Sequence, residues 1–406
     1  MRMWAWPARC VPTPRSRAMG MDVTALCRAA AEEATAWRRH LHEHPELGFE
    51  EFETTAFIEE KLRSFGGFRI ERPCPTGLVA VLAGSKPGKA IALRADIDAL
   101  PIQEDPRNDP CSQVPGVMHA CGHDGHAAAL LGAAKVLSSL PADTHGELRF
   151  FFQPAEEKQP GGAKGIVEAG WMEGVDLIYG MHFQSQEEVG TLWLKKGPLL
   201  ASTYTFDIQL RGKGTHAAFP HLGTDTILAA SQLVVALNQI TSRSIDPTAR
   251  ALLTVAAFEG GNSYNSLPEL VTLRGTIRIL DRQCEAPLLQ RVRQVVGGIE
   301  ALYGVSCSCE ITKGYGVLEN DPQSVEHAKR ILAEHFGQGA IFEPPAALGG
   351  EDFSAYLEHA PGCYYRVGAR KRKPDGSYYP SHQSRHEIND DALFYAIASE
   401  VYLALD

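Results

Sequence analysis

Apolar residues return along the chain with two spacings, which predict where helices and strands lie. A return every three or four positions is typical of a helix with one buried face, whereas a short apolar run between glycines is typical of a buried strand. The predicted helices begin at Asp22 and then span 53–65, 127–140, 225–240, 286–303, 324–336 and 393–405. The predicted strands span 78–82, 90–94, 147–152, 176–181, 203–210, 252–258, 271–280, 305–311 and 363–367. Such a mixture of helices and strands predicts an α/β protein.

The order of these elements changes near Gly197-Pro198. From there to Thr312 the pattern is strand, helix, strand, strand, helix, strand, which is the ferredoxin-like split motif. We therefore expect an inserted domain over 198–312. The larger domain around it would consist of 21–197 and 313–406.

Side chains with ligand or acid-base chemistry follow the apolar runs of the larger domain. Asp96 comes after the run 90–94, Glu156 and Glu157 come after 147–152, and His182 comes after 176–181. Open α/β folds keep their chemistry past the carboxyl ends of buried strands. We therefore expect these side chains to meet at one edge of a sheet.

The densest group of candidate ligands is the stretch 118–126, which holds three histidines, one cysteine and one aspartate. The thiolate of Cys121 and the imidazole of His123 suit a divalent metal ion, and the glycines between them allow a tight turn. A polar loop with incidental histidines is the alternative. The density of the group and the further candidates downstream favour a metal site.

The adjacent acids Glu156 and Glu157 can take two roles at a strand end that turns. One can bind a metal ion while the other stays free as a base, which takes a proton from water and returns it to a leaving amine. Taken alone, the pair is equally compatible with a solvated acidic loop. His182 alone is compatible with a core histidine, and His382 with a surface loop.

Composition and charge narrow the classes of partner. The chain has 406 residues and a formal net charge of −10, which argues against nucleic acid and anionic membranes. No apolar run approaches the ~20 residues of a membrane span. Nine irregularly spaced cysteines without a secretory signal predict free thiols in a reducing compartment, the cytoplasm. Residues 1–20 are basic and lack acids; we expect a disordered extension, from a transit peptide or from a true start at Met19 or Met21.

Seven motifs resemble those of the M20 metallopeptidase family, in its amidohydrolase branch of hippurate hydrolases, N-acyl-amino-acid amidohydrolases and plant auxin-conjugate hydrolases. They occur in family order and reach over most of the chain. The motifs are Arg94-Ala-Asp-Ile-Asp-Ala-Leu-Pro101, Met118-His-Ala-Cys-Gly-His-Asp-Gly-His126, Gln153-Pro-Ala-Glu-Glu157, Gly180-Met-His182, Gly214-Thr-His-Ala-Ala218, Gly275-Thr-Ile-Arg278 and Gly350-Glu-Asp-Phe353.

The resemblance implies a fold and a two-metal site. The larger domain would hold a central mixed sheet with helices on both faces, and the inserted domain would be a ferredoxin-like dimerisation domain that acts as a lid. Glu156 falls on the family's general base, and Asp96 would orient a ligand. Two divalent ions per chain are implied, Mn²⁺ or Zn²⁺, with Co²⁺ or Ni²⁺ also compatible. The positions that fall on the family's metal ligands are Cys121, His123, Glu157, His182 and His382.

The resemblance also implies residues that bind substrate in the inserted domain. His216 and Asn265 would bind substrate and stabilise the oxyanion, with His216 acting across a homodimer. Arg278 would receive a substrate carboxylate, because a guanidinium can donate to both oxygens. The chain departs from the family pattern after His382, where Gln383-Ser384 replaces a small polar residue and a proline, and in the segment Asn265-Ser-Leu-Pro-Glu269.

The implied activity is hydrolysis of N-acyl amino acids to a carboxylic acid and a free amino acid. One alternative keeps the fold and changes the substrate, as in a dipeptidase or a carboxypeptidase. A second alternative is a binding protein on the same scaffold without activity. The presence of the base and of all the implied ligands argues against that second alternative.

Overall fold

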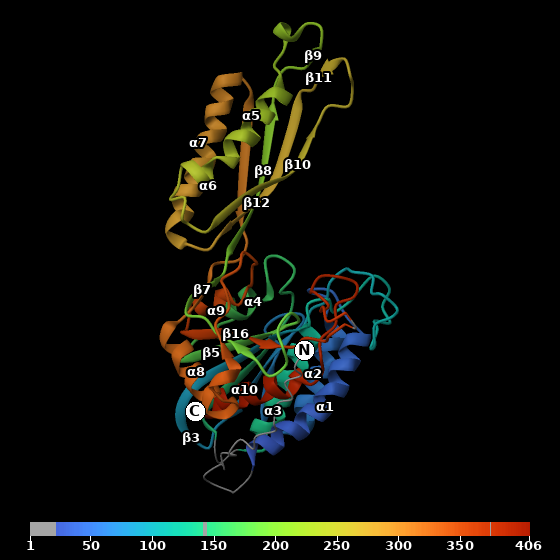
Figure 1. Ribbon diagram of the computed structural model, residues 1–406, viewed down its shortest axis with the longest axis vertical. Helices are drawn as coiled ribbons and strands as arrows, with labels where there is room; N and C mark the ends of the chain where they lie inside the picture. Colours follow the sequence, from blue (N-terminus) through green and yellow to red (C-terminus); the bar gives the residue numbers. More distant parts are fainter. Residues whose placement is uncertain (1–21, 141–143, 374) are drawn as a thin grey trace. The chain divides into compact units, whose positions relative to one another are not determined.

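The chain folds into two compact units, seen in a computed structural model that describes residues 22–140, 144–373 and 375–406 (Figure 1). The predicted N-terminal extension, 1–20, lies outside the described residues. The first unit comprises the described residues up to Gly197 together with Asn320–Pro345 and Ala355–Asp406. The second unit comprises Pro198–Glu319 and Ala346–Ser354.

The first unit is built on an eight-stranded mixed sheet. Because β4, β3, β5 and β16 run parallel, their carboxyl ends lie along one edge. β2 is antiparallel to β4, and β6 is antiparallel to β16. The strand order is β1 (Phe68–Glu71), β2 (Leu78–Ala83), β4 (His145–Gln153), β3 (Lys86–Asp96), β5 (Leu177–Gln184), β16 (Gly362–Gly368), β6 (Leu192–Trp193) and β15 (Ile341–Phe342).

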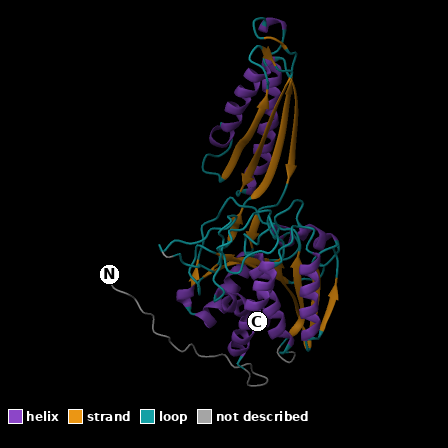
Figure 2. Ribbon diagram, turned by 90° about the vertical axis from the view of Figure 1, so that its right-hand side faces the viewer, coloured by secondary structure: helices purple, strands orange, loops and turns teal. Residues whose placement is uncertain are grey.

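Helices cover both faces of this sheet, as predicted (Figure 2). Along β4, Phe150 and Phe152 face the main hydrophobic core, while Phe151 between them points to the other face and contacts Tyr356 of α9 (Ser354–Leu357), with ring centroids 5.5 Å apart. α4 (Gly162–Glu168) also packs on β4. The helices that share the main core are α1 (Val23–Glu43), α2 (Phe52–Phe65), α3 (His123–Ser138), α8 (Pro322–Phe336) and α10 (Ala392–Leu405).

α3 is the most enclosed of these helices. It packs against α1, α10 and the sheet, and all but two of its residues are buried, as expected for a helix that is apolar on every side. Each buried leucine contributes about 1.5–3 kcal/mol. The close approach of α10 depends on Gly132, because a Cβ at that position would lie 2.5 Å from Ile397 Cδ1. α3 is therefore a rigid support for the residues at its first turn.

The second unit has its own antiparallel sheet and core. The strand order is β10 (Ala251–Gly260), β12 (Leu270–Ile279), β8 (Ser202–Arg211) and β13 (Ser306–Lys313). With α5 (Thr226–Asn238) and α7 (Glu285–Tyr303) this is the predicted ferredoxin-like arrangement. Shorter elements are β9 (Thr215–His216), β11 (Ser266–Leu267), α6 (Ile240–Arg243), β7 (Gly197–Leu200) and β14 (Leu318–Asn320).

The predicted elements that form both sheets are confirmed, with shifts of a few residues at their ends. Three details differ from the prediction. β3 extends to Asp96, so Asp96 is the last residue of the strand and does not follow it. β5 extends to Gln184, so His182 lies within the strand and not after it. α3 begins at His123, four residues earlier than predicted, because Gly122 adopts the left-handed conformation (φ 94°) that lets the turn lead straight into the helix. Among the described helices, none has the length and apolar character needed to span a bilayer.

Candidate metal centre

The five predicted ligands come together in the first unit, although they lie far apart in the sequence. Cys121 precedes α3 and His123 begins it, Glu157 follows β4, His182 lies in β5, and His382 lies in the loop between β16 and α10. The ligand atoms of Cys121, His123 and His182 lie within 4.8 Å of one another. The ligand atoms of Cys121, Glu157 and His382 also lie within 4.8 Å of one another. Cys121 therefore belongs to both groups.

The two adjacent acids both reach this place. Ligand atoms of Glu156, Glu157 and His123 lie within 4.8 Å of one another. Ala155 has a positive φ of 50°, and this left-handed residue turns the chain just before the acids. Glu156 is buried, whereas Glu157 is partly exposed. The backbone N–H of Glu157 donates to Asp98 Oδ2 at 2.9 Å, which fixes the turn.

One ring nitrogen of His123 and one of His182 already form a hydrogen bond with a backbone carbonyl oxygen. His123 Nδ1 donates to the backbone carbonyl of Asp98 at 3.0 Å, and His182 Nδ1 donates to that of Phe183 at 2.6 Å. A carbonyl oxygen can only accept, so both Nδ1 atoms carry hydrogen. Nε2 of each ring is then the nitrogen that can bind a metal ion. His182 Nε2 lies 3.4 Å from Cys121 Sγ, and this set of sulfur, nitrogen and oxygen donors fits a divalent transition metal.

Asp96, predicted to orient a ligand, lies buried among hydrogen-bond donors beside the candidate ligands. Its Oδ2 accepts from Arg94 at 2.8 Å and its Oδ1 accepts from His126 Nδ1 at 2.6 Å. His126 Nε2 accepts from the backbone N–H of Phe183 at 2.9 Å. Both nitrogens of His126 are therefore used by protein groups. The group of Asp96, His123 and His126, which also lies within 4.8 Å, holds β3, α3 and β5 together and does not offer a metal site of its own.

His382 stands on the exposed side of the centre. Its backbone has a positive φ of 60°, and its N–H donates to the carbonyl of Ala120 at 2.8 Å. The side chain turns toward Glu157, with Nε2 2.9 Å from Oε1. A left-handed residue other than glycine costs of order 1 kcal/mol or more and persists only where its surroundings hold it.

Burial and mutual charge displace the pKa values of these groups in opposite directions. Burial lowers the pKa of His182 well below its ordinary range. Burial would also lower the pKa of His123, but Asp96 and Cys121 outweigh it and raise the value well above the usual range. Hydrogen bonds with Cys121 and Glu157 raise the pKa of His382 to about 10, and burial raises that of Cys121. A small cluster in which some pKa values are raised and others lowered is typical of a functional site.

The predicted substrate-binding residues all lie in the second unit, and two of them are neighbours. β9 pairs with β11, which places His216 opposite Ser266. The N–H of Ala217 donates to the carbonyl of Asn265 at 2.8 Å. His216 and Asn265 are both exposed, so the structure brings these two together at one end of the unit.

Arg278 lies in β12 of the four-stranded sheet, at the end of that sheet far from β9 and β11 (Figure 1). It pairs with Thr203, at the start of β8, whereas Leu270, at the opposite end of β12, pairs with Arg211 just before β9. At about 3.3 Å per residue, the eight residues from Leu270 to Arg278 span roughly 26 Å. Within one chain, Arg278 is therefore not close to His216 or Asn265.

Asp98 and His126 were not among the predicted site residues, yet both support it. Asp98 accepts from His123 and from the backbone of Glu157. A signal for Asp98 was present in the sequence, because residues two apart at a strand end face the same side, as Asp96 and Asp98 do. His126 lies three residues after His123, and this spacing places both on one face of the first turns of α3.

Comparison with known proteins finds one matching family and several similar chains. The sequence model of peptidase family M20/M25/M40 matches residues 92–405. The chain is 43% identical over 324 residues to an N-acyl-L-amino acid amidohydrolase of Geobacillus stearothermophilus, covering 79% of this chain and 87% of the relative. It is 37% identical over 393 residues to thermostable carboxypeptidase 2 of Saccharolobus solfataricus, covering 95% and 99%. The crystal structure of the Bacillus subtilis YXEP protein, described as a dinuclear metal binding peptidase from the M20 family, matches with a TM-score of 0.81 at 33% identity, covering 93% of this chain and 98% of that one.

Proposed function

The chain belongs to peptidase family M20/M25/M40, in which it is a hydrolase of the amidohydrolase branch, and from that premise we propose that it cleaves the amide bond of N-acyl amino acids. The products are a carboxylic acid and a free amino acid. One observation carries the proposal: a buried acid, Glu156, shares a cluster with two candidate metal ligands, His123 and Glu157. A base beside a metal centre is what hydrolysis of an amide requires.

The proposed centre holds two divalent ions per chain, Mn²⁺ or Zn²⁺, with Co²⁺ or Ni²⁺ also compatible. The overlapping groups around Cys121 support two ions and not one. Bound ions supply an electrophile for the carbonyl oxygen and lower the pKa of water. The residues that would hold them are Cys121, His123, Glu157, His182 and His382.

Glu156 moves the proton in this proposal. It takes a proton from the attacking water as the water oxygen bonds to the carbonyl carbon. It then gives that proton to the nitrogen as the C–N bond breaks, so the amine leaves neutral. Burial keeps Glu156 close to the reacting atoms, and its neighbour Glu157 is left to bind the metal, with His382 on its far side.

The residues proposed to bind substrate lie too far apart within one chain to contact one small molecule together. Arg278 would receive the substrate carboxylate, and His216 with Asn265 would hold the carbonyl oxygen as negative charge develops on it. Arg278 is roughly 26 Å along β12 from Leu270, which pairs with Arg211 at the end of β8 that leads to His216. If Arg278 and His216 both contact one substrate, they come from two chains, which supports a homodimer with composite sites.

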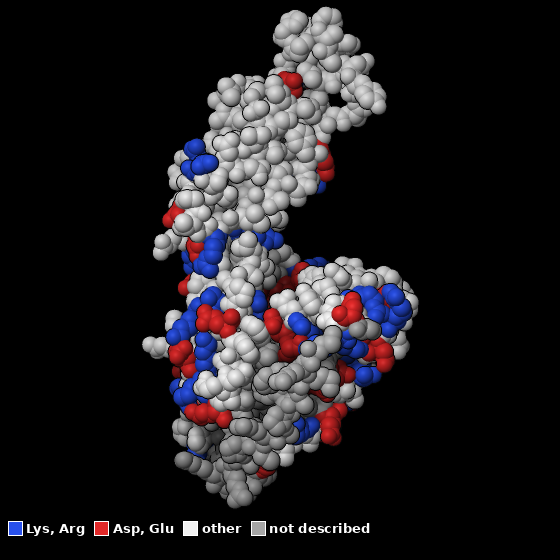
Figure 3. All heavy atoms as spheres, viewed as in Figure 1, with Lys and Arg blue, Asp and Glu red and all other residues white. Residues whose placement is uncertain are grey.

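The surface of the second unit supports this dimer. Among the described strands, β10 pairs only with β12 and leaves its other edge open, and an open edge can pair with a second copy about a two-fold axis. Large apolar side chains are exposed beside that edge, Leu228 and Val235 on α5 and Leu252 and Phe258 on β10. On the face shown in Figure 3, charged side chains are sparse over this unit.

The metal site and the substrate class are tested together. Metal analysis after dialysis should find close to two divalent ions per chain, and fewer in Cys121→Ser and in His182→Ala. A panel of N-acyl amino acids assayed with each metal should give turnover with at least one. Unchanged metal content in both variants would refute the ligand assignment, and the absence of turnover over the whole panel would refute the substrate class.

The dimer is tested by complementation. Glu156→Gln and His216→Ala should each be nearly inactive alone. In mixed dimers, one composite site keeps both Glu156 and His216, so subunit exchange should restore part of the activity. A fully active monomer in sedimentation experiments, or proven exchange without recovery, would remove the role of His216 across the dimer.

A second candidate function is that of a carboxypeptidase in the same fold. The relative that spans 95% of this chain bears that name, and Arg278 suits a terminal carboxylate in either class of substrate. N-benzoylglycine and a dipeptide of the same length separate the two, because only the peptide carries a free amine. We also propose that the enzyme works in the cytoplasm, since every cysteine in the described part of the chain is free.

A further inference from the structure

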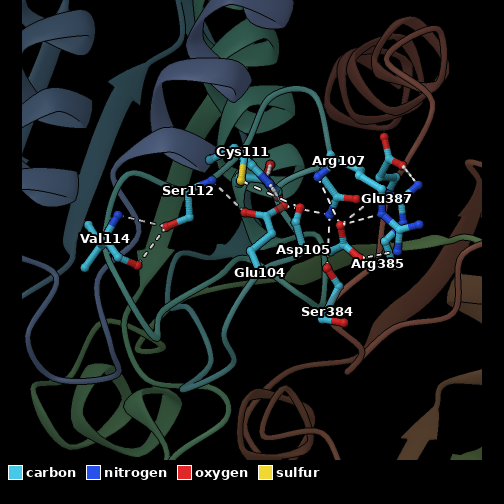
Figure 4. Close-up of polar contacts among 12 residues, drawn as sticks. Glu104, Asp105, Arg107, Cys111, Ser112, Val114, Ser384, Arg385 and Glu387 are labelled. Carbon is cyan, nitrogen blue, oxygen red and sulfur yellow. Dashed lines mark hydrogen bonds and ion pairs between the residues drawn. The ribbon is translucent and has the colours of Figure 1, made fainter.

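The loop that carries His382 is held by a segment that contains two buried polar residues with no assigned role. Two residues after His382, the carbonyl of Ser384 accepts two hydrogen bonds from the segment 104–108 (Figure 4). One comes from the backbone N–H of Asp105 at 3.0 Å and the other from Asn108 Nδ2 at 3.1 Å. Both donors fix the loop through its backbone, so they act on its position whatever side chain stands at Ser384.

Asn108 is itself held in one orientation. Its Nδ2 has two hydrogens, and the second donor direction is taken by Glu104 Oε1 at 2.8 Å. Glu104 also accepts from His42 Nε2 at 3.0 Å and from the backbone N–H of Ser112 at 2.6 Å. Asn108 and Glu104 are 5% and 3% exposed. A buried amide between two acceptors has little freedom to turn without losing a bond.

The same contacts continue to the other side of the metal centre. His42 Nδ1 lies 2.9 Å from Asp124 Oδ2, and Arg38 Nε donates to the same oxygen at 2.7 Å. Asp124 directly follows His123 in the first turn of α3. A continuous path of buried hydrogen bonds therefore joins the turn with His123 to the loop with His382. The path passes through Asp124, His42, Glu104 and Asn108.

We propose that Asn108 and Glu104 are positioning residues, which set the His382 loop against the turn that carries His123. The proposal rests on the proposed metal centre, because it gives these residues a purpose only if both histidines are ligands. The exposed neighbours of Asn108 contribute less to the position of the His382 loop. Arg107 donates to Asp105 from a side chain that is 76% exposed, and pairs of this kind are weak in water.

Loss of the Asn108 amide should loosen one ion and spare the other. In Asn108→Ala, the ion held by Cys121, Glu157 and His382 should bind about 10–100-fold more weakly, the usual cost of removing a group that orients a ligand. Co²⁺ titration of the metal-free protein, followed by visible absorption, resolves the two binding steps without any use of activity. Arg107→Ala is the matched control and should bind both ions as the wild type does.

A double-mutant cycle separates positioning from general damage to the fold. His382→Ala should weaken binding of the same ion by at least as much as Asn108→Ala does, and the Co²⁺ concentration range is chosen so that this weaker binding is still measured. If Asn108 acts through His382, adding Asn108→Ala to His382→Ala should cause no further loss of metal affinity. A further 10-fold loss in the double variant, or unchanged binding of both ions in Asn108→Ala, would overturn the proposal.

Two controls keep the outcome decisive. Thermal unfolding of the metal-free variants measures any loss of stability by itself. If Asn108→Ala does not fold, Asn108→Ser takes its place in the cycle, because its hydroxyl can donate to only one of the two acceptors. Wild-type protein that binds no divalent ion would refute the proposed metal centre. Wild-type protein that binds two ions, together with an additive cycle, would refute only the positioning role.

Discussion

The two units hold their functional candidates by different means. In the first unit, Asp96 and Arg94 form a pair whose side chains are 0% exposed, and Asp96 Oδ2 lies 3.6 Å from Nε2 of the candidate ligand His123. In the second unit, Arg250 and Asp281 form a pair of the same chemistry whose side chains are 49% and 31% exposed. His216 likewise stands on the surface of the second unit, on a strand of two residues.

This difference indicates what each unit supplies. Buried charges must be fully paired, because leaving one alone in a medium of low dielectric constant is costly. The first unit meets this condition around Asp96, so the fold itself holds the candidate ligands beside it. Among the described contacts of His216 and Asn265, the exposed candidates of the second unit, none is such a buried pair. Their geometry would then be completed by substrate and by a partner subunit.

The largest expected effect falls on the proton carrier. Glu156→Gln should lower turnover by about 10²–10⁴-fold, the usual contribution of a positioned acid-base group. Metal content should stay at the wild-type value, because Glu156 is not among the proposed ligands. Steady-state kinetics with metal analysis on the same sample checks both parts. Activity within a few-fold of wild type would show that Glu156 is not the base.

The buried pair should matter far more to stability than the exposed one. Asp96→Ala removes a carboxylate partner from the buried Arg94 and should cost about 3–5 kcal/mol in free energy of unfolding. Asp281→Ala, the matched change in the second unit, should cost less than about 1 kcal/mol. Urea unfolding of the metal-free proteins measures both. Equal losses of unfolding free energy in the two variants would mean that the buried pair contributes no more to stability than the exposed pair.

The smallest effect is a dependence on pH in the second unit. Hydrogen bonds from Arg250 lower the pKa of Asp281 below its ordinary value. The pair therefore stabilises the folded state above the unfolded pKa of about 3.9, and this contribution is lost as pH falls through the lower, folded value. The difference in stability between wild type and Asp281→Asn should shrink as the pH falls below about 4. A difference that grows toward acid pH would contradict this assignment.

Much of the fold could be predicted because it depends on local patterns. The main strands and helices follow the spacing of apolar residues, and the five candidate ligands follow family motifs. The missed elements are those with weak patterns. β1 is four residues long and only half-buried on one side, and α4 contains two glycines in seven residues. His182 lies inside β5 because the strand continues over polar Gln184, which an apolar run cannot indicate.

The long-range hydrogen bonds that hold the candidate site in place could not be predicted from local patterns. Asn108 and Ser384 are 276 residues apart, and His42 and Glu104 are 62 apart. Nothing in the local sequence of either residue indicates its partner, because the contact exists only once the sheet and α3 are assembled. Asp98 is an exception, since its spacing from Asp96 was visible in the sequence.

The way the second unit is joined to the chain has a consequence for its history. Its longer segment enters and leaves the four-stranded sheet through one strand pair, with Tyr204 of β8 directly opposite Lys313 of β13, so these two positions are only about 5 Å apart. A segment whose ends meet can enter or leave a host protein through a single genetic insertion or deletion, without stretching the host. The segment 204–313 is therefore suited to exchange between related enzymes as one insertion, which would alter assembly and substrate choice while leaving the candidate metal centre intact.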